Sequence, residues 1–240
     1  MNLLLLEPGE VRVTGRRAQH LREVIGAKVG STVRAGVIGG EIGIARVTAD
    51  DGEAIELALE LGGAAPEGMH VELVLAMPRP KVLARVLEAV ASFGVETVRL
   101  TNAWRVDKSY LKSPRLEREA IDEALRLGAE QGATTRLPQV TVHARLMELF
   151  DRAWPQPTKL IAHPGAPPLA RVGGPCVLAI GPEGGWIERE VETFVARGFA
   201  PVSIGAPILR VETAIAAALG QILLLRRLER GADLAGEHRG

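Results

Sequence analysis

Two glycine- and proline-rich segments near the C-terminus constrain this chain more than any other feature. Residues 180–186 read Ile-Gly-Pro-Glu-Gly-Gly-Trp, and residues 204–214 read Ile-Gly-Ala-Pro-Ile-Leu-Arg-Val-Glu-Thr-Ala. Each follows a short apolar run and precedes a run with helical spacing, so each is predicted to connect a strand to a helix. Turns of this kind bring bare backbone close to a ligand in α/β proteins. The pattern predicts an α/β fold that holds one ligand largely through main-chain groups.

Composition excludes several classes of protein. The chain has 240 residues, of which 47% are hydrophobic, enough for one large domain or two small ones. A net charge of zero argues against binding nucleic acid through global charge, and 3% aromatic residues argue against an extended base-stacking platform. The single cysteine, Cys176, excludes a disulfide framework and is predicted to be buried. No apolar run reaches the length of a membrane span and no signal-peptide pattern is present, so a soluble cytoplasmic protein is expected.

The N-terminal quarter has the pattern of a small β structure. Runs rich in Val and Ile at residues 32–38, 41–48 and 54–61 are separated by turn sequences, which is typical of a small barrel. Residues 62–66 read Gly-Gly-Ala-Ala-Pro and predict a linker. Two domains are therefore expected, over residues 1–67 and 70–240.

Beyond the linker, predicted strands alternate with predicted helices. Strands are expected at residues 71–77, 95–100, 138–142, 159–162, 176–180 and 201–204. Helices are expected at residues 81–93, 114–131, 187–197 and 211–230. Such alternation indicates βα units around a mainly parallel sheet.

The turn at residues 181–185 differs from a phosphate-binding loop. Such a loop places Lys and Ser or Thr behind its glycines, whereas Trp186 and Ile187 follow here, so nucleotide triphosphate binding is disfavoured. Pro182 fixes its own φ, and Glu183 lies at the tip. The turn is interpreted as a ligand loop; the simpler alternative is a tight strand-to-helix connection without a ligand.

Three further polar residues lie at the same kind of position. Arg210 directly precedes a predicted helix, where a cation opposes the helix dipole, so it is expected to face an electron-rich partner or a nearby carboxylate. Glu212 suits the dipole by itself. His163 follows another predicted strand, where a lone histidine is more often structural. No two histidines have metal-ligand spacing, so no metal is predicted.

Two segments are locally basic. Residues 12–34 contain six cations against one acid, and residues 99–115 contain five cations against one acid. Either segment is a solvated face or a phosphate-binding surface whose affinity would fall with salt.

Taken together, these motifs resemble the RsmE family of SPOUT methyltransferases, bacterial enzymes that methylate N3 of one uridine in 16S ribosomal RNA with S-adenosylmethionine. The resemblance covers nearly the whole chain, and its most specific parts are residues 180–185 and residues 208–214. Supporting matches are Glu130-Gln131 with Arg136 and Pro138 downstream, His163-Pro164, and His20-Leu21 leading to Val29-Gly30.

The resemblance implies a PUA-like barrel followed by a SPOUT domain with a trefoil knot, an exception to the rule that chains do not thread loops. It also implies a homodimer whose site is completed by both subunits. The residues that it implies for the cofactor are Ala162, His163, Pro164, Ile180, Gly181, Pro182, Glu183, Gly184, Gly185, Ile204, Gly205, Ile208, Leu209, Arg210 and Thr213.

The implied reaction requires removal of the N3 proton of uracil, which leaves negative charge on the ring. A guanidinium stabilises such an anion, and this role is assigned to Arg210. Glu183 or Glu212 is expected to accept the proton or to orient Arg210, and the choice stays open. The residues expected to contact the 16S RNA of the small ribosomal subunit are Arg12, Arg16, Arg17, Arg22, Lys28, Arg34, Arg79, Lys81, Arg105, Lys108 and Arg136.

The sequence departs from the family pattern at Gly26, Ala89, Ser92 and Thr134, positions expected to concern RNA contacts more than the cofactor turns. Two alternatives stay open. One is a SPOUT enzyme that methylates ribose 2′-hydroxyls in another RNA. The other is a non-catalytic RNA-binding module that serves ribosome assembly.

Overall fold

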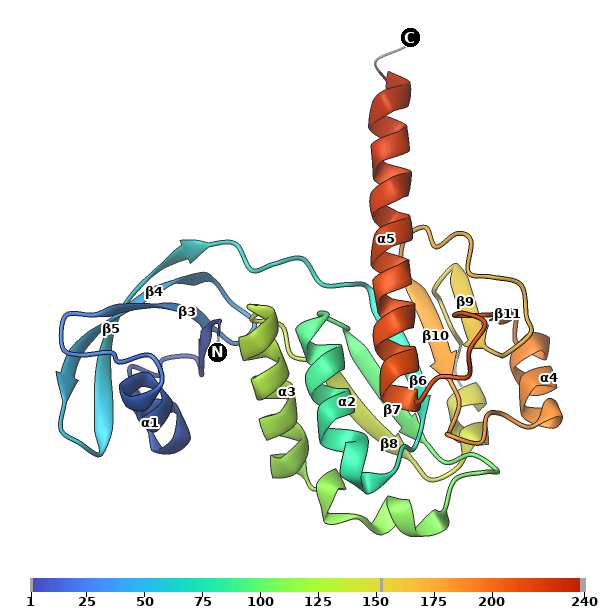
Figure 1. The fold of residues 1–240 in the computed structure, drawn as a ribbon, viewed down its shortest axis with the longest axis horizontal. Coiled ribbons are helices and arrows are strands. Elements are labelled where there is room, and N and C mark those ends of the chain that lie inside the picture. The colour runs from blue at the N-terminus through green and yellow to red at the C-terminus, as the bar shows by residue number, and fades with distance from the viewer. Residues whose placement is uncertain (1, 152, 238–240) are drawn as a thin grey trace.

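The chain folds around two sheets that are formed by consecutive parts of the sequence (Figure 1). The computed structural model describes residues 2–151 and 153–237, with side chains described as far as Arg230. A five-stranded sheet has the order β1-β3-β4-β5-β2, and a six-stranded sheet has the order β11-β9-β10-β6-β7-β8. The predicted α/β architecture with a small N-terminal β unit is confirmed.

The N-terminal sheet is largely antiparallel and curled. Its elements are β1 (Leu4–Leu6), β2 (Arg12–Thr14), α1 (Gly15–Glu23), β3 (Thr32–Val37), β4 (Ile42–Asp50) and β5 (Ala54–Gly63). Neighbouring strands pair antiparallel except β1 and β3, and a register shift between Val47 and Ala49 bends β4 against β5. The prediction of β structure throughout was wrong for α1, which buries only Ala18 and Leu21 and so has little apolar periodicity.

The C-terminal sheet, which was predicted to be mainly parallel, is entirely parallel. Its strands are β6 (Val71–Ala76), β7 (Thr97–Thr101), β8 (Gln139–His143), β9 (Thr158–Ala162), β10 (Cys176–Ile180) and β11 (Ala200–Val202). Every residue of β6 and β10 is buried, because a parallel sheet covered on both faces requires continuous apolar runs. Cys176 is buried as predicted, and burial raises the pKa of its thiol.

Helices cover this sheet (Figure 1). They are α2 (Pro80–Ser92), α3 (Arg118–Gly132), α4 (Glu188–Ala196) and α5 (Val211–Glu237), with short 3-10 helices η1 (Lys108–Lys112), η2 (Pro114–Leu116) and η3 (Leu146–Asp151). α2 and α3 lie side by side, and α5 extends far beyond the sheet. The helix predicted from residue 114 begins only at Arg118, because the Ser113 hydroxyl accepts the Arg115 amide at 3.2 Å and starts η2 instead.

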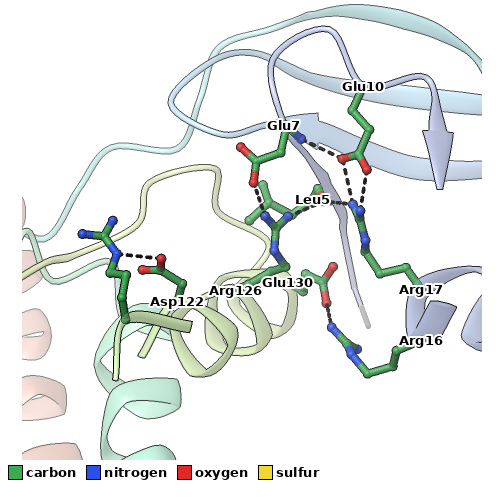
Figure 2. A network of polar contacts seen from close by, with 9 residues as sticks. Leu5, Glu7, Glu10, Arg16, Arg17, Asp122, Arg126 and Glu130 are labelled. Atoms are coloured by element: carbon green, nitrogen blue, oxygen red, sulfur yellow. Dashed lines mark hydrogen bonds and ion pairs between the residues drawn. The ribbon is translucent and has the colours of Figure 1, made fainter. Parts of the chain in front are cut away.

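The first strand is joined to α3 by a polar network around Leu5 (Figure 2). Arg126 of α3 donates to the Leu5 carbonyl at 3.0 Å and to the Glu7 carboxylate. Arg17 of α1 donates to the same carbonyl at 3.1 Å and to Glu10 at 2.9 Å. Because one backbone oxygen accepts from both guanidinium groups, β1, α1 and α3 are held at one point.

A buried carboxylate lies at the centre of this junction. The Glu130 side chain is 2% exposed, and its Oε2 lies 3.7 Å from Nη2 of Arg16. Its Oε1 has no hydrogen-bond partner among the described residues. Burial raises the pKa of Glu130, although Arg16 and the Leu5 amide oppose that shift.

We predict that Glu130→Gln stabilises the protein at neutral pH. The pKa of Glu130 is raised in the folded state from its ordinary value of 4.5, so its contribution to stability is complete below that pH and is lost as the pH rises through the folded value. The amide keeps the shape of the side chain and carries no charge. Thermal denaturation from about pH 4 to pH 8 should show a higher Tm for the variant near neutrality and a difference that closes toward acid.

Glu123→Gln provides the matched control, since Glu123 pairs with the same Arg16 at 2.9 Å but is half exposed. It should show no such pH-dependent gain. A lower Tm for Glu130→Gln at neutral pH would contradict the assignment of a costly buried charge.

Candidate functional site

Three loops meet at one edge of the parallel sheet. Strands β11, β9 and β10 are neighbours in the sheet and run parallel, so the loops that follow them leave at the same edge. The loops enclose a cavity of about 340 Å³ together with the start of α5. That volume lies in the range of small-molecule sites.

The residues predicted for a cofactor gather in this cavity. All of them except Arg210 and Thr213 line it. The lining residues that were not predicted are Arg105, Trp186, Ser203, Pro207, Val211 and Ala214. Five of these six lie beside predicted residues in the two C-terminal motifs, whereas Arg105, expected to contact RNA and not the cofactor, comes from the loop after β7.

The loop after β10 is a tight turn fixed from inside. The Gly185 amide donates to the Pro182 carbonyl at 2.8 Å, and Gly185 has a φ of +72°, which favours glycine. A Cβ on Gly181 would lie 3.1 Å from the Trp186 ring. Trp186 is buried and packs on Phe194 at a centroid distance of 5.1 Å. Its indole N–H has no hydrogen-bond partner among the described residues, although Trp186 lines the cavity.

A fourth loop, between β7 and η1, supports this turn from outside. Arg105 donates to the Gly184 carbonyl, and a Cβ on Gly184 would lie 3.0 Å from Cδ of Arg105. The preceding amide, of Trp104, donates to Oε1 of Glu190 at 2.8 Å. The other oxygen of Glu190 accepts the Ile187 amide at 3.0 Å. The start of α4 therefore holds both the turn and the loop that covers it.

The loops after β9 and β11 pair with each other. The Ser203 amide donates to the Pro167 carbonyl at 2.8 Å, and the Leu169 amide donates to the Ser203 carbonyl at 3.2 Å. The His163 amide donates to the Val202 carbonyl at 2.9 Å, while its Nδ1 lies 2.8 Å from the Pro164 carbonyl. The histidine side chain thus holds its own loop.

The predicted catalytic residues occupy different surroundings. Glu183 lines the cavity, and its Oε1 lies 3.6 Å from Nε of Arg79. Arg210 lies between the lining residues Leu209 and Val211, but its exposed side chain does not line the cavity. Glu212, in the first turn of α5, lies outside the lining as well. The structure therefore brings Glu183, and not Glu212, to the cavity.

The N-terminal basic segment is largely paired. Four of its six cations contact carboxylates that a count over residues 12–34 leaves out: Arg12 with Asp51 at 3.2 Å, Arg16 with Glu123 at 2.9 Å, Arg22 with Asp50 at 2.6 Å, and Arg17 with Glu10. Three of these partners lie more than 25 residues away along the chain, so local counting missed them. The folded protein therefore leaves fewer unpaired cations in this segment than the count over residues 12–34 suggests.

The other predicted RNA-contacting residues are spread over both parts of the chain. Arg79 lies beside Glu183, and Arg136 donates from Nε to the Pro66 carbonyl at 3.0 Å. No ion pair links Lys28, Arg34, Lys81 or Lys108 to another residue that the structure describes.

Among the described side chains of residues 2–151 and 153–230, no group of His, Cys, Asp and Glu is arranged to hold a metal ion. No helix in these ranges has both the length and the apolar character needed to cross a bilayer.

Comparison with known proteins identifies the family of this chain. The model of the RNA methyltransferase domain family matches residues 65–223. The ribosomal RNA small subunit methyltransferase E of Treponema pallidum is 30% identical, over 93% of this chain and 91% of the relative. The ribosomal RNA small subunit methyltransferase E 1 of Borreliella burgdorferi is 25% identical, over 91% of this chain and 95% of the relative.

Solved structures share the fold over the same extent. A ribosomal RNA small subunit methyltransferase E from Neisseria gonorrhoeae, solved bound to S-adenosyl methionine, aligns with a TM-score of 0.77 at 23% identity, covering 94% of this chain and 98% of that one. A probable rRNA-methyltransferase from Porphyromonas gingivalis aligns with a TM-score of 0.75 at 22% identity, covering 95% and 100%. The resemblance predicted from the two C-terminal motifs is thereby confirmed, and the chain belongs to the RsmE family of RNA methyltransferases.

Proposed function

We propose that this protein methylates N3 of one specific uridine in the 16S RNA of the small ribosomal subunit, with S-adenosylmethionine as the methyl donor. The observation that carries the proposal is the cavity built from the three loops after β9, β10 and β11. Relatives named for methylation of small-subunit ribosomal RNA align with this chain over nearly its whole length, which supports the substrate class.

The cavity fits this cofactor in size and chemistry. The side chains of Ile180, Ile204 and Leu209 give apolar walls that suit an adenine ring. The glycines at positions 181, 184 and 185 leave bare backbone beside the cavity for the cofactor to approach. When bound, S-adenosylmethionine supplies an electrophilic methyl group.

The protein must then make the acceptor nitrogen nucleophilic. We assign proton removal to Glu183 rather than Glu212, because Glu183 lines the cavity and its ion pair with Arg79 holds it there. Arg210, exposed beside the cavity, stabilises the negative charge that develops on the uracil carbonyl oxygens. The cations without ion pairs, which are Lys28, Arg34, Lys81 and Lys108, contact RNA phosphates.

The organisation of the protein completes the proposal. Residues 1–67 form a PUA-like RNA-binding domain, and residues 70–240 form the SPOUT domain. The pairing of the loop after β11 with the loop after β9 supports a trefoil knot at the cavity. Helix α5 carries Leu223, Leu224 and Leu228 at 36%, 55% and 60% exposure, which supports a homodimer through this helix. The enzyme acts in the cytoplasm, where its ribosomal substrate is assembled.

We predict that Arg210→Ala lowers turnover about a hundredfold or more while leaving cofactor affinity unchanged, because it removes charge stabilisation at the base and nothing from the cavity lining. Labelled cofactor and isolated small subunits that lack the modification provide the assay. Mass spectrometry of nucleosides from the wild-type reaction should give 3-methyluridine. A 2′-O-methylated nucleoside would favour the ribose-modifying alternative, and absence of any product would favour a non-catalytic module.

We predict that Gly184→Val abolishes cofactor binding. A Cβ at this position already meets Arg105 at 3.0 Å, so a branched side chain must displace Arg105 or the turn, and both line the cavity. Calorimetry and the thermal shift on adding S-adenosylmethionine both report binding to the folded protein. Gly173→Val is the control, since a Cβ there has only an ordinary contact, 3.7 Å from Glu229, and lies outside the cavity. Normal affinity in Gly184→Val would refute the loop assignment.

A further inference from the structure

One large aromatic side chain is left in solvent. Trp104 is 79% exposed, whereas every other aromatic residue that the structure describes is buried or partly buried. Five of those pack on one another: the ring of Phe194 lies 5.0 Å from Phe150 and from Phe199 and 5.1 Å from Trp186, and Phe199 lies 5.7 Å from Trp154. The chain therefore gathers its few aromatic rings into one core and leaves a single indole outside it.

The backbone that carries Trp104 is held firmly beside the cavity. Its amide donates to Oε1 of Glu190 at 2.8 Å, at the first turn of α4. The next residue, Arg105, donates to the Gly184 carbonyl and lines the cavity. Two more hydrogen bonds hold residues 102–106. The Asn102 side chain accepts from the Ala103 amide at 3.0 Å, and the Val106 amide donates to the Ala103 carbonyl at 3.0 Å. An aromatic side chain on such a fixed loop is preorganised for contact.

The surroundings favour an anionic, aromatic partner. The segment that continues from Trp104 carries Arg105, Lys108, Lys112 and Arg115, and the three that follow Arg105 have no ion pair with any described residue. Its one acid, Asp107, accepts the Ser109 amide at 2.9 Å. Cations bind RNA phosphates, and an exposed ring stacks on bases that have left a duplex.

We infer that Trp104 is a stacking platform for an unpaired RNA base, at or next to the base that receives the methyl group. The inference rests on the proposed action on RNA and adds a substrate-positioning residue to it. Charge on the neighbouring segment and the direct connection of Arg105 to the cavity favour RNA over a second copy of the chain as the occupant of this surface.

The first experiment compares Trp104→Ala and Trp104→Phe in methylation of isolated small subunits. Loss of a stacked base should raise the KM for the subunits about tenfold or more in Trp104→Ala, with a much smaller change in kcat. The cofactor Kd should stay unchanged by calorimetry. Trp104→Phe, which retains an aromatic face, should recover most of the loss. Val195→Ala, which trims a side chain 46% exposed on α4, should leave KM unchanged.

Three outcomes of that experiment would overturn the platform. These are an unaltered KM in Trp104→Ala, a Trp104→Phe variant as impaired as Trp104→Ala, and a change of oligomeric state in Trp104→Ala by size exclusion with light scattering. The last result would assign the ring to contact with a second copy instead.

A second experiment does not depend on the methylated nucleotide. Because Trp154 and Trp186 are buried, emission that acrylamide can quench comes from Trp104, and Trp104→Phe should lack it. A single-stranded oligouridylate at saturating concentration should protect this emission in the wild-type protein. Protection without methylation of small subunits would refute the proposed target and leave the platform intact. Methylation with Trp104 still fully quenchable in the presence of RNA would refute the platform alone.

Discussion

Parallel pairing of β11, β9 and β10 is the constraint on which the site depends. β10 is buried along its whole length and pairs with β6 on one side and β9 on the other. Because all these pairs are parallel, chain segments that follow residues 162, 180 and 202 leave the sheet at one edge and close a single cavity. A loss of register in β9 would separate the loop of His163 from that of Ser203, and the main-chain bonds between these loops would not form.

The orientation of the N-terminal sheet depends on a different kind of contact. At the junction with α3, a buried apolar cluster of Leu3, Leu5 and Ala129 is joined by hydrogen bonds from Arg126 and Arg17 to the Leu5 carbonyl. Directional hydrogen bonds restrict the angle more than apolar contact does, since they weaken steeply once the donor–hydrogen–acceptor angle falls below about 120°. Burial raises the pKa of Glu130 at this interface, and its Oε2 lies 3.7 Å from Nη2 of Arg16 in α1.

Sequence patterns were sufficient to predict the features that depend on residues close together in the chain. The strand at residues 176–180 was predicted with its observed ends. A short continuous apolar run bounded by proline and glycine is typical of a buried strand in a parallel sheet. The two C-terminal turns likewise contain most of the residues that line the cavity. Arg105 was not found as a lining residue, because its contact with Gly184 joins positions 79 residues apart. Arg22 and Arg12 were counted as unopposed for the same reason, since Asp50 and Asp51 reach them from the end of a distant strand.

The departures from the family pattern lie away from the cavity. The Ser92 hydroxyl donates to the Ala89 carbonyl at 2.8 Å at the end of α2, where Gly132 of α3 packs so closely that a Cβ would lie 2.4 Å from the Ser92 carbonyl. Thr134 is buried, and its hydroxyl accepts the Arg136 amide at 3.2 Å. Ser92 therefore lies at the contact of α2 with α3, and Thr134 lies in the segment that leads into β8. The cavity can persist through such changes, because none of the four departing positions lines it. Specificity for RNA, which side chains carry, is then the property that such substitutions can alter.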